Sequence, residues 1–211
     1  GGSFAAALRR KGAVSRILGV GRNRRSLQEA IELGLIDAAV SPEEAAVQAD
    51  VIMLSVPVGN TQSILETMLP ALNEHTLITD AGSTKVSVVE AARVALGDRI
   101  GQFVPGHPIA GAETTGPAAA MADLCEGRTV VLTPLEESSI AARRCITRLW
   151  EACGARVITM EPDTHDVVLA SVSHVPHFLS SVFMWQVASA KNSDIRLELA
   201  GSGFRDFTRI A

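Results

Sequence analysis

Apolar and polar positions follow each other in blocks that predict a regular alternation of strands and helices up to about residue 160. Short apolar runs indicate buried strands, and longer stretches with apolar residues three or four positions apart indicate amphipathic helices. The run Val51–Pro57 is apolar at nearly every position, which is typical of a strand buried on both faces of a parallel sheet. We therefore expect a doubly wound, mostly parallel α/β sheet over residues 1–163.

The strands and helices predicted in this region alternate along most of its length. The strands are expected at Val14–Val20, Val51–Pro57, Thr76–Thr79, Ile100–Val104, Thr129–Thr133 and Arg156–Met160. The helices are expected at residues 4–11, 27–33, 42–48, 60–72, 84–96, 118–124 and 137–152. Ser41 is the expected N-cap of the third helix, and either Ser83 or Thr84 that of the fifth. The residues expected to end helices are Gly12, Gly34 and Gly97.

After Pro162 the pattern changes to helices alone. Residues 164–190 are predicted to form one long, mostly apolar helix with a kink at Pro176, and residues 195–211 begin another segment. The apolar segment Val167–Ala190 contains two histidines, a proline and several serines, which argue against a membrane span. We place a domain boundary at 161–164, so that residues 1–163 form the α/β domain and residues 164–211 the start of a helical domain.

Composition narrows the range of functions. A length of 211 residues with 47% hydrophobic residues is enough for a sizeable core. The net charge of -4 argues against a nucleic-acid-binding protein, which would need a basic patch. The three cysteines are odd in number and lack C-x-x-C spacing, so we expect reduced thiols. With no basic-apolar leader at the start, we expect a soluble cytoplasmic protein.

The chain opens on Gly1-Gly2-Ser3, which leads directly into a predicted helix. We expect a strand and the first part of a glycine turn to precede residue 1, the alternative being a cloning scar. A helix entered through two glycines at the start of a βαβ unit is the last part of a dinucleotide-binding fingerprint, with the helix N-terminus facing the pyrophosphate. Gly1, Gly2 and Ser3 are therefore candidate cofactor-binding residues.

The turn Gly21–Ser26, which follows the next strand, contains three arginines and no carboxylate. An NAD site uses Asp or Glu at this point to hold the ribose 2′-hydroxyl, whereas arginine suits the 2′-phosphate of NADP. We therefore favour NADP, with use of both NAD and NADP or a merely solvated charge run as alternatives. The candidate cofactor-binding residues in this turn and after the next two strands are Arg22, Asn23, Arg24, Ser26, Val56, Pro57, Asp80 and Gly82.

The stretch Gly106–Gly116 carries the strongest catalytic candidate. His107 stands between Gly106 and Pro108 and follows the predicted strand Ile100–Val104, so we expect it in a loop at a strand end, where α/β proteins bind ligands. A neutral imidazole accepts a proton near pH 7, which makes His107 a candidate general base. The alternative is a turn whose histidine only bonds the backbone.

Four blocks of sequence together resemble one enzyme family: Asp80–Lys85, Gly106–Glu113, Ser173–His177 and Gly203–Ala211. With them the chain resembles the prephenate/arogenate (cyclohexadienyl) dehydrogenases of tyrosine biosynthesis. The resemblance implies a Rossmann domain followed by an all-helical dimerisation region, and hence a homodimer. It also implies NAD(P)-dependent oxidative decarboxylation of prephenate or arogenate, giving 4-hydroxyphenylpyruvate or tyrosine.

The resemblance also implies roles for single residues. His107 would be the base that takes the proton of the ring hydroxyl, and Ser83 would help to orient that hydroxyl. Arg209 would anchor a substrate carboxylate, since a guanidinium can grip it with two hydrogen bonds. His177 would lie on the substrate side, and Glu113 would be either a gate at the pocket mouth or a surface residue.

Each of these roles has a structural alternative. Ser83 fits a helix cap, and Arg209 fits an ion pair with Asp206, three residues earlier. His174 and His177 share a helix face, but no third ligand lies within sequence reach, so we expect no metal site. A buried, hydrogen-bonded His174 is the favoured interpretation of that residue.

Two other functions compete with this one. Another Rossmann hydroxy-acid dehydrogenase would need a base and a carboxylate anchor, but not both the His107 and the Arg209 blocks. A regulatory module that senses NAD(P) without turnover would have no use for a base at residue 107. Prephenate and arogenate are not separated by the sequence, and neither is control by tyrosine.

Overall fold

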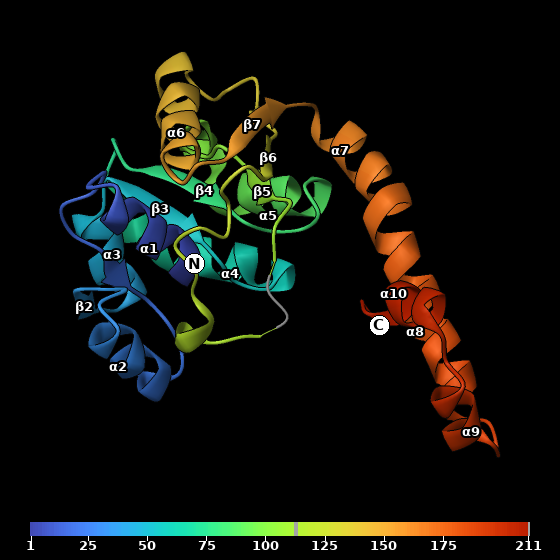
Figure 1. Ribbon diagram of the computed structural model, residues 1–211. Coiled ribbons are helices and arrows are strands. Elements are labelled where there is room, and N and C mark those ends of the chain that lie inside the picture. Colours follow the sequence, from blue (N-terminus) through green and yellow to red (C-terminus); the bar gives the residue numbers. More distant parts are fainter. Residues whose placement is uncertain (112–113, 211) are drawn as a thin grey trace. The chain divides into compact units, whose positions relative to one another are not determined.

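The computed structural model describes residues 1–111 and 114–210. The chain divides into two compact units, Gly1–His165 and Asp166–Ala211. Strands and helices alternate in the first unit, and the second unit is helical (Figure 1). The predicted α/β class and the change to helices are confirmed.

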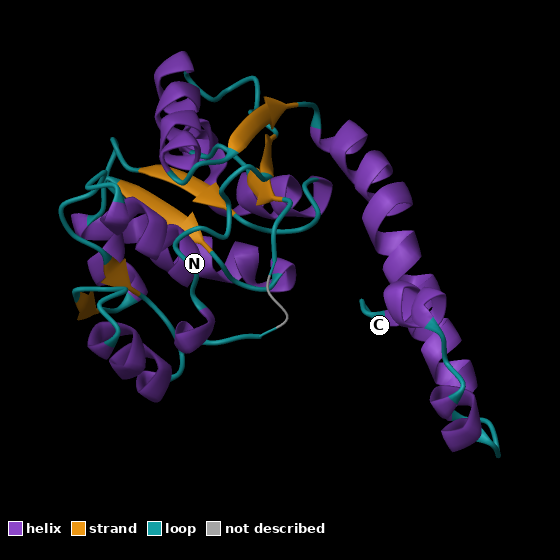
Figure 2. Ribbon diagram, in the orientation of Figure 1, coloured by secondary structure: helices purple, strands orange, loops and turns teal. Residues whose placement is uncertain are grey.

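Most described elements of the first unit follow the predicted order, but several boundaries are shifted and the strand β2 was not predicted (Figure 2). The helices are α1 (Gly2–Arg10), α2 (Arg24–Glu32), α3 (Pro42–Gln48), α4 (Thr61–Met68), α5 (Val86–Leu96), α6 (Ile140–Ala152) and the start of α7 (Pro162–Leu169). The strands are β1 (Leu18–Gly19), β2 (Ala38–Ala39), β3 (Val51–Leu54), β4 (Leu77–Asp80), β5 (Gly106–Pro108), β6 (Thr129–Leu132) and β7 (Arg156–Thr159).

Strand pairing is mostly parallel, as predicted. The hydrogen-bonded ladders are β1–β2, β3–β4 and β5–β6–β7. β3 and β4 run parallel, with Val51 opposite Leu77, and β6 and β7 are parallel as well. β5 is antiparallel to β6, with His107 opposite Val131. The strand that carries the catalytic candidate is therefore the exception to the parallel pattern.

Helices cover both faces of the central strands, which explains the continuous apolar run in β3. Ile52 and Leu54 belong to a core cluster that α3, α4 and α5 complete. Val51 and Met53 pack against a second cluster, which is built largely from α1 and α6. Successive side chains of a strand point to opposite faces, so a strand between two helical layers needs apolar residues at every position.

The strand predicted at Ile100–Val104 is wrong. The chain instead forms a 3₁₀ helix at Gly97–Gln102, and a single isolated bridge follows it. Side-chain bonds to a distant loop hold this turn: Arg99 Nη2 and Gln102 Nε2 both donate to the carbonyl of Asn73, at 2.6 and 2.8 Å. These tertiary contacts outweigh the local strand preference of the apolar residues.

The helix predicted at 118–124 is reduced to a 3₁₀ turn at Pro117–Ala119. Ala120 is already extended, with ψ of 126°. The next amide, that of Met121, donates to Ser3 Oγ at 3.1 Å, a bond that reaches across the chain to the start of α1. An amide engaged in this way is not available to continue a helix.

Several predicted helix ends are confirmed. Ser41 caps α3 in a full capping box: its hydroxyl accepts from the Glu44 amide at 3.1 Å, and its own amide donates to the Glu44 carboxylate at 2.8 Å. Gly12 and Gly34 follow α1 and α2 with φ of 62° and 66°, a conformation that glycine adopts without strain.

The predicted cap of α5 at Ser83 or Thr84 is wrong, because α5 begins at Val86 and Lys85 is at the N-cap position. The turn before the helix is longer than expected because Asp80 organises it. The Asp80 carboxylate accepts hydrogen bonds from the Gly82 amide and from the Lys85 ammonium group. A charged side chain that folds back on the preceding strand is not visible in the local pattern.

The helical unit contains the rest of α7, a π-helical turn at Ala170–His174, α8 (Val175–Ala188), α9 (Ser193–Glu198) and α10 (Ser202–Thr208). The π turn lies directly before Pro176, the predicted kink, where the missing amide hydrogen interrupts the α-helical bonding pattern. The Ser180 hydroxyl donates to the Phe207 carbonyl at 2.8 Å and joins α8 to α10. His174 is exposed, so the prediction that it is buried is wrong.

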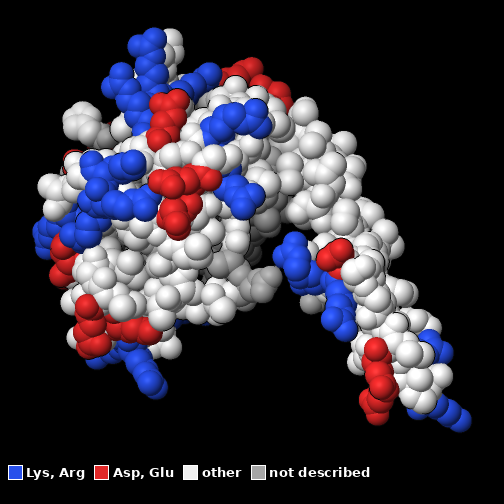
Figure 3. Space-filling model, in the orientation of Figure 1, with Lys and Arg blue, Asp and Glu red and all other residues white. Residues whose placement is uncertain are grey.

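On the face shown in Figure 3, much of the surface of the helical unit carries no Lys, Arg, Asp or Glu side chain. Trp185 is 71% exposed, and Phe178 and Leu199 are 67% and 78% exposed. Among the described residues, one helix, Pro162–Ala188, has the length and hydropathy needed to cross a membrane. Only 11% of its most apolar 18-residue stretch is buried. Helices that pack against another protein chain also show such an apolar surface.

Cys125, Cys145 and Cys153 form no disulfide with one another, in agreement with the predicted reduced thiols. Burial raises the pKa of the Cys153 thiol to about 12 and also raises the pKa of Cys125. Because the thiolate is the reactive form, burial lowers the reactivity of these two cysteines at neutral pH.

Candidate active site

His107 lies at the centre of β5, in a strand and not in the predicted loop. Its backbone is fixed by the antiparallel ladder with β6, and its side chain is half-buried. The Gly-His-Pro sequence that suggested a loop is accommodated because β5 is only three residues long. The histidine is thus attached to the sheet itself, which favours a precisely held side chain.

A buried ion pair clamps the residue before His107. Lys85 Nζ donates to Asp80 Oδ2 at 2.5 Å and to the carbonyl of Gly106 at 2.7 Å. Asp80 Oδ1 accepts from the Gly106 amide at 2.9 Å, and Asp80 Oδ2 from the Gly82 amide at 2.8 Å. Both backbone groups of Gly106 are therefore bonded to one Asp–Lys pair.

This clamp is nearly closed to water. The side chains of Lys85 and Asp80 are 0% and 4% exposed. Buried charges are tolerated when they are paired and their remaining donors and acceptors are satisfied, and the two Gly106 bonds meet that need. A Cβ at Gly106 would lie 3.1 Å from the Asp80 carbonyl oxygen, so a side chain there would push against the clamp. The position is built for glycine.

A second histidine contacts His107. His107 Nδ1 lies 2.9 Å from His165 Nε2, and the two rings meet edge to face with centroids 5.1 Å apart. His165 is 0% exposed and lies in the first turn of α7, where its amide donates to the Glu161 carbonyl at 2.9 Å. In a hydrogen bond at this distance one imidazole donates and the other accepts, so the tautomers of the two rings depend on each other.

The two glycines at the N-terminus of α1, Gly1 and Gly2, are closely packed. A Cβ on Gly1 would lie 3.2 Å from the Ser55 side chain, which directly follows β3, and one on Gly2 would lie 3.1 Å from Ala120. The Ser3 hydroxyl accepts a hydrogen bond from the Met121 amide. Val56 and Pro57 directly follow Ser55, so the structure brings Gly1 close to the segment that contains these two candidate cofactor-binding residues.

The arginine-rich turn begins α2. The Asn23 carboxamide oxygen accepts from the amides of Arg25 and Ser26 at 2.9 and 3.2 Å, which makes Asn23 the N-cap of that helix. Arg22 and Arg24 are exposed. The guanidinium groups are accessible to a ligand, while the capping oxygen of Asn23 has a structural task.

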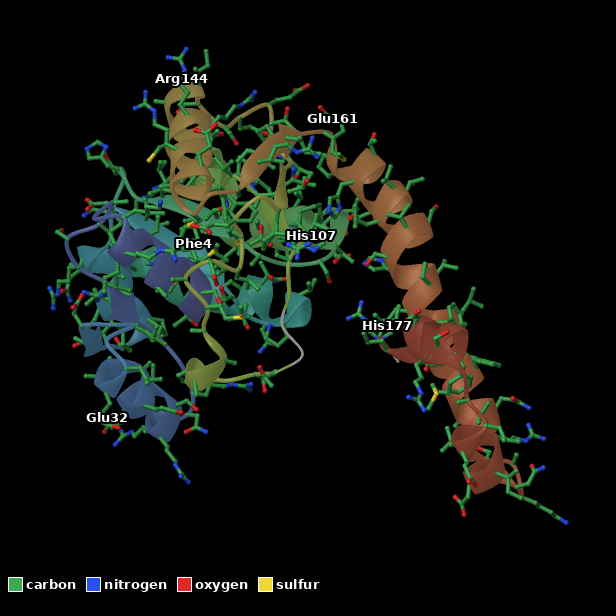
Figure 4. All side chains as sticks on the ribbon, in the orientation of Figure 1. Phe4, Glu32, His107, Arg144, Glu161 and His177 are labelled. Atoms are coloured by element: carbon green, nitrogen blue, oxygen red, sulfur yellow. The ribbon has the colours of Figure 1, made fainter. Side chains whose placement is uncertain are left out.

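The remaining predicted site residues lie elsewhere. Ser83 is exposed in the turn between β4 and α5. His177 lies on α8 and Arg209 directly follows α10, so both belong to the helical unit, whereas His107 belongs to the α/β unit (Figure 4). Glu113 lies outside the described residues. In the described ranges, no group of three His, Cys, Asp or Glu residues could hold a metal ion.

Two family models match this chain. The nucleotide-binding domain of prephenate dehydrogenase matches residues 4–159, and the prephenate dehydrogenase dimerization domain matches residues 161–211. The chain belongs to the prephenate dehydrogenase family. The first unit is the nucleotide-binding domain of that family and the helical unit corresponds to its dimerisation domain.

Curated relatives agree with this assignment. The chain is 35% identical to the prephenate dehydrogenase of Bacillus subtilis, covering 100% of this chain and 57% of that protein. It is 36% identical to the cyclohexadienyl dehydrogenase of Zymomonas mobilis, covering 80% of this chain and 58% of that protein. The chain thus spans little more than half the length of these relatives.

Solved structures of the family share the fold. The prephenate dehydrogenase of Aquifex aeolicus, in complex with hydroxyphenyl propionate and NAD+, superposes with a TM-score of 0.89 at 36% identity, covering 99% of this chain and 73% of that one. The arogenate dehydrogenase of Synechocystis superposes with a TM-score of 0.81 at 31% identity, covering 100% of this chain and 74% of that one.

Sequence reasoning about this prephenate dehydrogenase family member did not predict two residues that hold the candidate base. Lys85 belongs to the family-like block Asp80–Lys85 but had no predicted role. A single lysine before a helix is normally an exposed side chain. His165 had no local signal, because its partner is 58 residues away in the sequence. Both residues are recognised only through contacts between distant segments.

Proposed function

We propose that the full protein catalyses the NAD(P)-dependent oxidative decarboxylation of prephenate, arogenate or both. The observation that carries this proposal is the placement of His107. Its backbone is clamped through Gly106, and its ring is paired through Nδ1 with a buried histidine. Relatives named prephenate dehydrogenase and cyclohexadienyl dehydrogenase, at 35% and 36% identity, support the substrate class.

In this proposal His107 acts on the ring hydroxyl of the substrate. When bound, the nicotinamide ring supplies the hydride acceptor for the carbon that carries this hydroxyl. His107 accepts the hydroxyl proton as the carbonyl forms. Breaking of the bond to the ring carboxylate then releases carbon dioxide. The electron pair of that bond makes the ring aromatic, and the new phenolate oxygen recovers the proton from His107.

The substrate-side roles remain proposals from the resemblance. Ser83 would orient the ring hydroxyl together with His107, and its exposed position leaves it accessible to a ligand. Arg209 would bind a substrate carboxylate, and His177 would lie on the substrate side. Glu113 would act as a gate. A cytoplasmic location likewise stays a prediction.

The chain has features that fit a dinucleotide. The N-terminus of the nine-residue helix α1 presents backbone amides suited to a pyrophosphate. Gly1 keeps the space beside these amides open, because a Cβ at this position would lie only 3.2 Å from the Ser55 side chain. Asp80 has both carboxylate oxygens engaged inside the protein, so any contribution to cofactor binding passes through the shape of its loop. The cofactor is a nicotinamide dinucleotide, with NADP proposed ahead of NAD.

The test of the function is the rate of reduced-cofactor formation by the full-length protein. Prephenate and arogenate are each combined with NAD and with NADP. We expect turnover in at least one combination, and the pair with the highest kcat/KM identifies the physiological substrate and cofactor. If a folded protein that binds the dinucleotide turned over neither substrate, the proposed reaction would be wrong and a sensing module would become the better explanation.

The cofactor preference is tested at the exposed arginines. In the double variant Arg22→Gln, Arg24→Gln, we expect KM for NADP to rise about 10- to 100-fold, the effect of losing charge-assisted hydrogen bonds to a phosphate. KM for NAD should stay within about 2-fold, since NAD lacks the 2′-phosphate. Arg144→Gln, at an exposed arginine of α6, is the matched control. Equal changes for both cofactors would contradict phosphate recognition by this turn.

We also propose that the full protein is a homodimer formed through the helical unit. The large exposed apolar side chains of α8 and of the residues after α9 suit burial against a partner surface. These residues lie within the range 161–211 that matches the family's dimerization domain.

A further inference from the structure

We infer that His165 is a positioning residue for the base, and that its Nε2 accepts a hydrogen bond from His107 Nδ1 and so keeps His107 in the tautomer that can take a proton at Nε2. The inference rests on the proposed function, because it assigns to His165 a task in that reaction. The contact itself is direct, since the two ring nitrogens are 2.9 Å apart.

The hydrogen bond between the two rings can run in either direction, and only one direction serves the reaction. If His165 Nε2–H donated to His107 Nδ1, the neutral His107 ring would carry its own proton on Nε2 and could not accept another there. If His107 Nδ1–H donates to His165 Nε2, the opposite nitrogen of His107 has a lone pair for the hydroxyl proton. The same bond then becomes charge-assisted when His107 is protonated.

Burial makes His165 suitable for this task. The residue is 0% exposed, so bulk water does not compete for the contact with His107. Its backbone is fixed in the first turn of α7 by the bond from its amide to the Glu161 carbonyl. An acceptor on a fixed element can hold the ring of its partner in one orientation.

The two supports of His107 complement each other. The ladder with β6 and the Asp80–Lys85 clamp on Gly106 fix the backbone of β5, which leaves the two side-chain torsions of His107 still to be set. The contact with His165 acts on the ring itself. Asp80 and Lys85, the charged groups next to Gly106, are bonded to each other, and the ring nitrogen that faces His107 Nδ1 is His165 Nε2.

The tautomer can be measured without changing the enzyme. Ring 15N chemical shifts of the full-length protein, recorded where histidine is neutral, separate protonated from unprotonated nitrogens. The chain has five histidines, and the spectrum of His107→Asn identifies the signals of His107. We expect a protonated Nδ1 and an unprotonated Nε2 on His107. A protonated Nε2 on neutral His107 would overturn the inference, whatever the variants show.

Two substitutions separate the accepting atom from the volume of the side chain. In His165→Gln the amide oxygen comes close to the place of Nε2 and can accept the same bond, whereas His165→Leu fills similar space without an acceptor. We expect kcat to fall about 10- to 100-fold in His165→Leu and to stay within about 5-fold of wild type in His165→Gln. KM for the cofactor should change less than 2-fold in both variants.

The outcomes distinguish this inference from the proposed function. If wild-type protein turned over neither substrate, the function would fail before His165 was tested. If wild type were active and both variants lost the same activity, or neither lost any, the accepting role of His165 would be wrong. If His165→Leu failed to fold, the wild-type tautomer and the activity of His165→Gln would still decide, because loss of kcat above 10-fold in a folded His165→Gln contradicts the inference.

Discussion

Replacing His107 with Asn should lower kcat of the full-length protein with its preferred substrate by at least about 100-fold, the scale of a lost general base. Asn has similar polarity but cannot accept a proton at neutral pH. The β5 backbone and the clamp on Gly106 do not depend on the imidazole, so the fold and the dinucleotide affinity should stay close to wild type. Steady-state kinetics and cofactor titration measure the two effects separately.

His75→Asn is the matched control for this experiment, because His75 is an exposed histidine in the loop before β4. It should leave kcat within about 2-fold of wild type, as is usual for surface substitutions away from special features. Activity of His107→Asn near the wild-type level would remove His107 from the role of base. A parallel loss of cofactor binding would instead indicate that the substitution disturbs the nucleotide-binding domain.

Lys85→Met should lower the free energy of unfolding by about 3–5 kcal/mol, which is the usual cost of removing one partner of a buried ion pair. The substitution removes the counter-ion of the Asp80 carboxylate, which is 4% exposed, and it removes the bond to the Gly106 carbonyl. Urea unfolding of the full-length protein measures the loss. Because the released segment carries His107, kcat should fall as well.

Two further variants test the cause of this loss. Asp80→Asn combined with Lys85→Met removes both charges, so the double variant should be more stable than Lys85→Met alone. Arg93→Met breaks the pair with Glu137, whose side chains are 47% and 39% exposed, and should cost no more than about 1 kcal/mol. A Lys85→Met variant as stable as Arg93→Met would mean that the buried pair contributes little.

Structural elements that depend on residues close together in the sequence were predictable. The capping box of Ser41 and Glu44 lies within four residues, and the structure contains both of its hydrogen bonds. The apolar run of β3 predicted burial on both faces, and two core clusters provide it. His107 was identified as a candidate from its glycine and proline neighbours. Its proposed role as base, and those of Ser83, His177, Arg209 and Glu113, come from the family resemblance and stay predictions.

Predictions failed where a distant side chain decided the backbone. Arg99 and Gln102 bond the Asn73 carbonyl and turn an apolar segment into a 3₁₀ helix. Lys85 folds back onto Asp80 and delays the start of α5 beyond the expected serine cap. In both cases long polar side chains reach a group that periodicity and capping rules do not include.

The sequence by itself determined the α/β alternation, the change to helices after Pro162, most helix ends and the family. Those features depend on interactions within a few residues, or on motifs that are read as strings. Only the tertiary structure placed His107 in an antiparallel strand, buried Lys85 against Asp80 and set His165 beside the candidate base. The energy of such contacts depends on burial and on the approach of segments 20 to 60 residues apart, as in the separations of 21, 26 and 58 residues seen here. No local pattern in a single chain contains that information.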